Sequence, residues 1–183
     1  MTASPARQAP GRTLVAGVGN IFLGDDGFGV EVARRLAGAG LPSWVQVADY
    51  GISGMHLAYD LADRYDTAIL IDTARRGEEP GTLTVIEADR PGPPAEGRLF
   101  DAHGMQPDVV LGVLDMLGAS PARVLVVGCE PASLDYGMEL SEPVAKAVGA
   151  AVQIVMDLIA ESADKTASSA EEEGASHVPR HTR

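Results

Sequence analysis

The sequence predicts a three-layer α/β domain built on a mainly parallel sheet. Short runs rich in Val, Ile and Leu alternate along the chain with segments in which apolar residues recur every three or four positions. Such alternation of strands and helices is typical of a parallel sheet covered by helices. The first run, TLVAGV at 13–18, shows no polar alternation, as expected of a strand buried on both faces.

The predicted elements cover most of the chain between residues 13 and 161. Strands are expected at 13–18, 44–48, 68–71, 83–87 and 124–128. Helices are expected at about 27–38, 53–63, 106–118 and 141–160. The connection before 83–87 is too short for a crossover helix, so this strand is expected to pair antiparallel with its predecessor.

Length and composition indicate one soluble domain. The 183 residues are 45% hydrophobic and 22% charged, which suits a single core. We predict a flexible leader at 1–12, one α/β domain at 13–161 and a disordered tail at 162–183, which is small, polar and aperiodic. The N-terminus does not resemble a signal peptide, and no apolar run approaches the ~20 residues of a membrane span. A cytoplasmic protein without a membrane partner is expected.

The charge and cysteine content exclude several classes of function. The formal net charge of −12 argues against a nucleic-acid partner, because phosphate binding needs a basic surface. An acidic surface instead attracts cations or a basic protein. The single cysteine, Cys129, excludes an internal disulfide framework and a multi-cysteine metal site.

Polar side chains with ligand or catalytic chemistry follow the predicted strands, where open α/β sheets bind their ligands. They are Asp25, Asp26, Asp49, Asp72, Cys129 and Glu130, with His103 in the loop before the helix expected at 106–118. Two or three carboxylates and one histidine could bind a divalent transition metal, and a site so poor in protein ligands leaves coordination positions open. The spacing does not identify the metal.

Structural roles compete with this hypothesis at each carboxylate. Asp25 or Asp26 could cap the helix that follows. Asp72 could cap a turn or pair with Arg75 or Arg76.

The histidines and the cysteine also have ordinary explanations. His103 could be a plain loop residue, and His56 lies in a helical pattern that suits packing or the surface. His177 and His181 belong to the tail and are expected to be inert. Cys129 is expected to be a small buried hydrophobic residue, although a cysteine hydrolase that uses Cys129 and His103 is an alternative.

The glycines after the first strand resemble the start of a dinucleotide-binding loop. Gly17 and Gly19 fit the pattern, but its third glycine would fall at Phe22. A nucleotide-binding enzyme is therefore a disfavoured alternative, and the acidic residues nearby would repel a pyrophosphate.

Five ordered segments resemble blocks of the hydrogenase maturation endopeptidases and together span about residues 13–160. They are GVGNIFLGDDGFGV, ADYGISGMHLAYDL, LIDTARRGEEPGTL, HGMQPDVVLGVLDMLG and VLVVGCEPASLDYGMELSEPVAKAV. The resemblance implies a twisted five-stranded sheet flanked by helices. It also implies a cytoplasmic monomer that removes the C-terminal extension of a nickel–iron hydrogenase large-subunit precursor after nickel insertion.

The resemblance further implies a nickel-recognition role for Asp26, Asp72 and His103, with nickel met in the substrate and not permanently bound. Asp49 matches another acidic position of the family and is the candidate catalytic base. The alternative is that nickel itself polarises the scissile carbonyl or activates water. Many relatives have Glu where this chain has Asp26, which leaves Asp25 as an alternative ligand. A metal-binding maturation chaperone without protease activity is a further alternative.

Overall fold

A computed structural model describes residues 11–62, 65–88 and 121–175, with side chains described as far as residue 163. The elements, in chain order, are β1 (Thr13–Val18), the short 3-10 helix η1 (Gly24–Gly27), α1 (Phe28–Ala37), β2 (Val45–Gly51), α2 (Gly54–Ala62), β3 (Thr67–Thr73), β4 (Leu83–Ala88), β5 (Arg123–Cys129) and α4 (Glu142–Ala175). All five predicted strands are present. His103 and the helix predicted at 106–118 lie outside the described residues.

The strands form one mostly parallel sheet in the order β2-β1-β3-β5-β4, which confirms the predicted fold class. Only β4 is antiparallel, and it pairs with β5. The expectation that it would pair with its predecessor β3 is wrong. Strand β3 is central, and both of its edges are occupied by β1 and β5, so β4 is placed at the free edge of β5.

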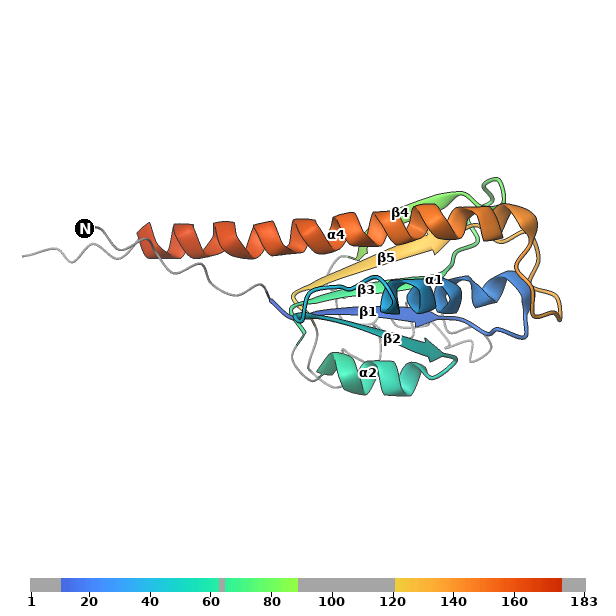
Figure 1. Cartoon of the computed structure of the whole chain (residues 1–183), viewed down its shortest axis with the longest axis horizontal. Coiled ribbons are helices and arrows are strands. Elements are labelled where there is room, and N and C mark those ends of the chain that lie inside the picture. The colour runs from blue at the N-terminus through green and yellow to red at the C-terminus, as the bar shows by residue number, and fades with distance from the viewer. Residues whose placement is uncertain (1–10, 63–64, 89–120, 176–183) are drawn as a thin grey trace, which may run out of the picture.

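Helices cover both faces of the sheet (Figure 1). On one face, α1 and α4 pack against the side chains that alternate strand residues direct toward them, such as Val15, Ile71 and Val127. On the other face, α2 packs against the intervening residues, such as Leu14 and Leu70. The central strands β1 and β3 are therefore buried on both sides, as the absence of polar alternation in the sequence predicts.

Two glycines allow α1 to lie unusually close to the sheet. A Cβ atom at Gly29 would meet the carbonyl oxygens of Val18 and Ile71, and one at Gly17 would meet the carbonyl oxygen of Gly29. Any side chain at either position would push the helix outward. The glycine-rich sequence thus serves helix–sheet packing, and it fixes the turn at 24–27 above the carboxyl ends of β1 and β3.

The C-terminal helix is longer than predicted. Its backbone is helical to Ala175, so the prediction of a disordered tail from residue 162 is wrong for residues 162–175. This stretch is rich in Ala and Glu, and extending an existing helix avoids the cost of nucleation. The described part of the helix from Glu142 to Ala163 has the length and mean hydropathy, 1.5, of a membrane span. Its apolar face, however, is part of the core through Val144, Val148 and Val155.

Candidate functional site

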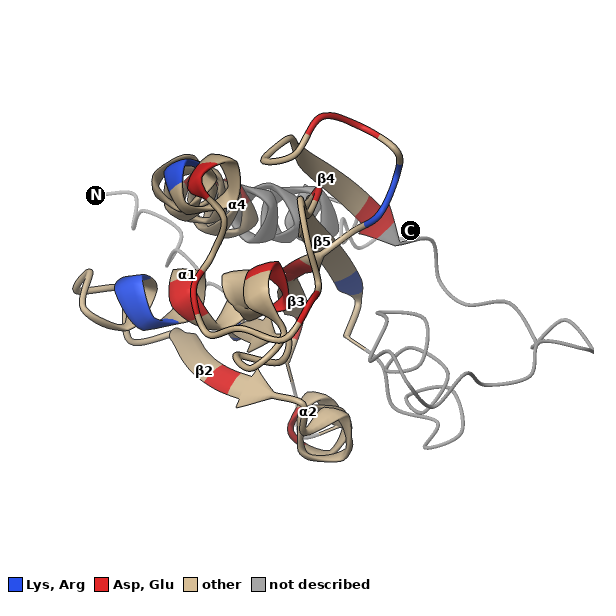
Figure 2. Ribbon diagram, turned by 90° about the vertical axis from the view of Figure 1, so that its right-hand side faces the viewer, with Lys and Arg blue, Asp and Glu red and all other residues tan. Residues whose placement is uncertain are grey.

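The candidate residues that the structure describes lie at the carboxyl ends of the strands. Figure 2 looks onto this end of the sheet, where Asp and Glu residues occur on several neighbouring loops. Asp26 and Asp72 come together there, Asp49 lies to one side on β2, and Asp25 is turned inward. Across the described residues, no group of three or more His, Cys, Asp or Glu side chains is arranged to hold a metal ion.

Asp26 is the half-buried carboxylate of the turn between β1 and α1. Its Oδ2 accepts a hydrogen bond from the backbone N–H of Asn20 at 2.7 Å, and its Oδ1 accepts one from the Thr73 hydroxyl at 3.1 Å. The second bond ties the turn to the end of β3. Gly19 adopts a φ of 127° beside this turn, in the region that favours glycine. A Cβ atom at Gly19 would clash with the backbone carbonyl oxygen of Asp26.

Asp72 is buried at the end of β3, with 6% of its surface exposed. Its Oδ1 accepts a hydrogen bond from the backbone N–H of Thr73 at 2.7 Å, and the structure pairs it with neither Arg75 nor Arg76. Burial, together with the nearby charge of Asp26, raises the pKa of Asp72 to about 7. A buried acid with a raised pKa at the end of a strand is a candidate functional residue.

Asp25 is a structural residue, although it neighbours Asp26. Its buried carboxylate accepts hydrogen bonds from the backbone N–H groups of Ala132 (2.8 Å), Ser133 (3.0 Å) and Ser141 (2.6 Å), and from the Ser141 hydroxyl (2.9 Å). Burial alone would raise the pKa of Asp25, but these four donors outweigh it and lower the pKa. A carboxylate so fully engaged is a poor metal ligand, so the geometry favours Asp26 over Asp25.

Neither adjacent acid caps α1. The N-cap residue of that helix is Gly27, and no side chain bonds to its first turn. The capping interpretation of Asp25 and Asp26 is therefore wrong. Asp25 instead bonds to Ser141, the residue that precedes α4.

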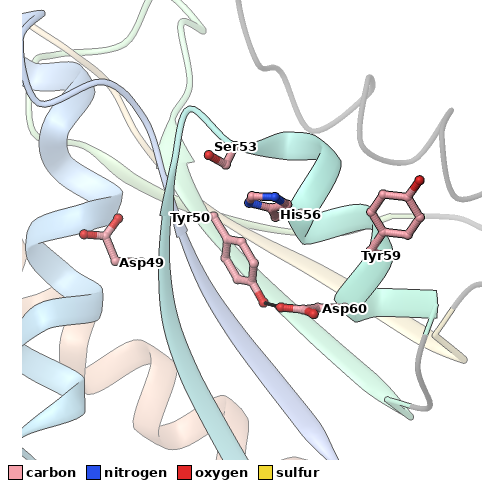
Figure 3. A pocket seen from close by; sticks show the side chains of 6 residues that line it. All are labelled: Asp49, Tyr50, Ser53, His56, Tyr59 and Asp60. Atoms are coloured by element: carbon pink, nitrogen blue, oxygen red, sulfur yellow. Dashed lines mark hydrogen bonds between the residues drawn. The ribbon is translucent and has the colours of Figure 1, made fainter.

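Asp49 is exposed on β2 and lies on the α1 side of that strand. Its Oδ2 accepts a hydrogen bond from the Arg34 guanidinium at 3.4 Å. Figure 3 shows its carboxylate on the side of β2 away from the Tyr50 ring. A pocket of about 320 Å³ opens between β2 and α2 and is lined by Asp49, Tyr50, Ser53, His56, Tyr59 and Asp60. This pocket contains neither Asp26 nor Asp72, and His56 is a surface residue of its wall.

Cys129 and Glu130 are buried at the end of β5. Burial, with the nearby charges of Asp25 and Glu130, raises the pKa of the Cys129 thiol to about 11, so the thiol is protonated at neutral pH and a poor nucleophile. Glu130 accepts a hydrogen bond from the backbone N–H of Arg76 at 2.6 Å. The turn that follows Thr73 is therefore held by Glu130, and the carboxylate has a structural role.

The residues that hold Asp26 and Asp72 in place were not among the residues predicted from the sequence. Thr73 donates one hydrogen bond to each of them, from its hydroxyl to Asp26 and from its backbone N–H to Asp72. The position of Thr73 directly after Asp72 could have indicated such a role. Ser141 could have been identified as the residue before a helix, since Glu142 and Pro143 follow it.

An α/β domain with two acids at the carboxyl ends of its strands can host many functions, and comparison with known proteins identifies the family. Residues 30–158 match the family model described as hydrogenase maturation protease. A putative hydrogenase maturation protease of Methanocaldococcus jannaschii is 37% identical over 147 residues, which cover 78% of this chain and 93% of the relative. The hydrogenase 2 maturation protease of Escherichia coli is 31% identical over 152 residues, covering 82% and 92%.

Solved structures agree with the sequence comparisons. The hydrogenase maturating endopeptidase HybD from E. coli superposes with a TM-score of 0.67 at 29% identity, covering 82% of this chain and 93% of that one. The chain belongs to the hydrogenase maturation protease family and is a peptidase.

Proposed function

We propose that this peptidase removes the C-terminal extension of a nickel–iron hydrogenase large-subunit precursor after nickel has been inserted. It recognises the nickel through Asp26, Asp72 and His103. Membership of the family supports the processing of a hydrogenase precursor. The observation that carries the nickel role is the juxtaposition of the Asp26 and Asp72 carboxylates through Thr73.

The chemistry of the carboxylate pair favours a divalent cation. Two acids held together repel each other, and burial adds to the cost of ionising Asp72. A bound divalent cation would offset both costs, and nickel accepts imidazole and carboxylate ligands. A site with so few protein ligands leaves positions on the metal for ligands that the precursor already supplies, so nickel is met in the substrate.

Asp49 is proposed as the general base that activates water. Its carboxylate is exposed, and its ion pair with Arg34 spans 3.4 Å between two exposed side chains. Such pairs are weak, so the carboxylate can leave Arg34 when substrate binds. Asp49 lies on the same edge of the sheet as the turn that carries Asp26, because β2 pairs in parallel with β1 and Asp49 is in register with Gly17.

The protein is further proposed to act in the cytoplasm as a monomer. Its acidic surface suits a precursor whose contacting face is basic, and it gives no support to a nucleic-acid partner.

Intact-mass measurement tests the proposed reaction. Nickel-loaded precursor incubated with the protein should lose the mass of its extension, whereas nickel-free precursor should keep it. Loss of mass from both forms at equal rates would refute nickel recognition but would still show protease activity. If neither form is cut but the nickel-loaded precursor binds, the protein is a maturation chaperone.

A further inference from the structure

The loop that joins β5 to α4, residues 131–141, presents large apolar side chains to solvent. Tyr136 is 95% exposed and Met138 is 70% exposed, and Phe22, on the neighbouring turn, is 58% exposed. Phe, Tyr and Met are enriched in protein interfaces. An exposed cluster of these types marks an interaction site more often than a random surface does.

This loop is held in a fixed position beside the site. Gly24 N–H donates to the Gly137 carbonyl at 2.8 Å, and Gly137 N–H donates to the Phe22 carbonyl at 3.0 Å. The four hydrogen bonds to Asp25 anchor both ends of the loop. Tyr136 and Met138 are thus exposed on a preorganised backbone, which lowers the entropic cost of binding a partner.

A groove of about 340 Å³ separates the loop from α1. Its lining includes Gly27, the apolar side chains of Ile21, Met138 and Leu140, and the charged side chains of Glu31, Arg34 and Arg35. Gly27 directly follows Asp26, and Arg34 is the ion-pair partner of Asp49. The groove therefore passes from the turn that carries the proposed metal ligand to the partner of the proposed base.

We infer that this groove and the apolar cluster of Phe22, Tyr136 and Met138 bind an extended segment of the precursor. This inference rests on the proposed function. The side chains of Ile21, Met138 and Leu140 in the groove suit apolar side chains of that segment. The two arginines of the lining are each paired with an acid, Arg34 with Asp49 and Arg35 with Glu31. Loop 131–141 contains Asp135 and Glu139 but no Lys or Arg, so basic side chains of the precursor complement its rim. Asp25 binds the loop to the turn of Asp26, and it thereby keeps the docked segment in register with the metal-recognition residues.

The inference is tested with two matched double variants. Tyr136→Ala/Met138→Ala removes two of the three side chains of the cluster. Met55→Ala/Tyr59→Ala removes the same two residue types from α2, where Met55 is 59% and Tyr59 is 60% exposed. All four side chains are exposed, so both variants should keep the melting temperature of the wild type. The Kd for nickel-loaded precursor is measured by titration at low temperature, and cleavage is followed by intact mass.

Tyr136→Ala/Met138→Ala should raise the Kd and the KM at least about tenfold and leave kcat within about twofold. Met55→Ala/Tyr59→Ala should change neither. Equal Kd values for both variants and the wild type overturn the inference, and continued cleavage would leave the proposed function intact. If Tyr136→Ala/Met138→Ala raises the Kd but neither the wild type nor the variants cut the precursor, docking is supported and the proposed protease activity is refuted. Concentration-dependent self-association that only the first variant abolishes identifies a second copy as the occupant and overturns the inference.

Discussion

Replacing Asp72 with Asn should stabilise the protein while it removes function. The pKa of Asp72 rises from an ordinary 3.8 to about 7, chiefly through burial. A carboxyl group whose pKa is higher in the folded state takes up a proton on folding. Stability is therefore lost as pH rises from about 4 to about 7, and the cost is fully present above that window. Asn has the same shape and no charge to bury, and its Oδ1 still accepts from the Thr73 N–H.

The size of the gain follows from the pKa difference. At about 1.4 kcal/mol for each pH unit, the rise from 3.8 to about 7 corresponds to a cost of up to about 4 kcal/mol at pH 8. Even half of it, about 2 kcal/mol, raises the melting temperature of a domain of this size by about 4–8 °C. The same substitution removes a negative ligand, so nickel-dependent cleavage should be lost.

The assay is thermal unfolding of wild type and Asp72→Asn, without metal, at pH 4 and pH 8. The variant should be more stable at pH 8, and the difference should nearly vanish at pH 4. A less stable variant at pH 8, or an equal gain at both pH values, would show that the burial argument is wrong.

Asp25→Asn is the matched control, for which the expected change in stability at pH 8 has the opposite sign. The pKa of Asp25 is lowered in the folded state, so its stabilisation is present above the unfolded pKa and is lost as pH falls through that region. An amide NH₂ would face backbone N–H donors, and at pH 8 the variant should lose about 2–3 kcal/mol.

Three further outcomes are expected. Cys129→Ser should fold and retain cleavage, because the thiol is fully buried with a pKa of about 11; complete loss of turnover in a folded variant, measured by mass, would favour a cysteine hydrolase. Asp26→Asn and His103→Ala should each reduce cleavage of nickel-loaded precursor by at least about tenfold. The double variant should cut only slightly more slowly than either single variant, because the two residues act as one unit. Additive losses in cleavage time courses would contradict this. Deleting residues 165–183 should change the melting temperature by less than about 2 °C, since α4 projects beyond the sheet (Figure 1), and a larger drop by calorimetry would show that this end docks.

The regular part of the fold could be predicted because burial imposes a pattern on the sequence. Strands such as Thr67–Thr73 are apolar throughout because helices cover both faces, and the helix Phe28–Ala37 shows its buried stripe in the spacing of apolar residues. The partner of β4 could not be predicted in this way. Its antiparallel direction follows from a short connection, but its position beside β5 depends on which sheet edge remains free, and that edge is set by strands far away in the sequence.

The helical continuation to Ala175 was missed for a related reason. Polar composition indicates that a segment cannot form a core, but it does not prevent a helix that is already nucleated from extending. The backbone of residues 162–175 continues a helix for which Glu142–Ile159 supplies the nucleus and the core contacts.

The roles of the adjacent acids Asp25 and Asp26 could not be distinguished from the sequence. Asp25 and Asp26 are the same residue type, and each is flanked by one Gly and one Asp, so either could be the ligand on sequence alone. The 3-10 turn directs successive side chains to different sides: one meets the backbone donors of 132–141 and the other meets Thr73. These donors lie 47 to 116 residues away along the chain. The assignment of one acid to structure and the other to nickel therefore depends on tertiary contacts, and it predicts opposite phenotypes. Asp25→Asn should lower stability and lose activity through misplacement of the turn, whereas Asp26→Asn should fold normally and lose only the nickel-dependent step.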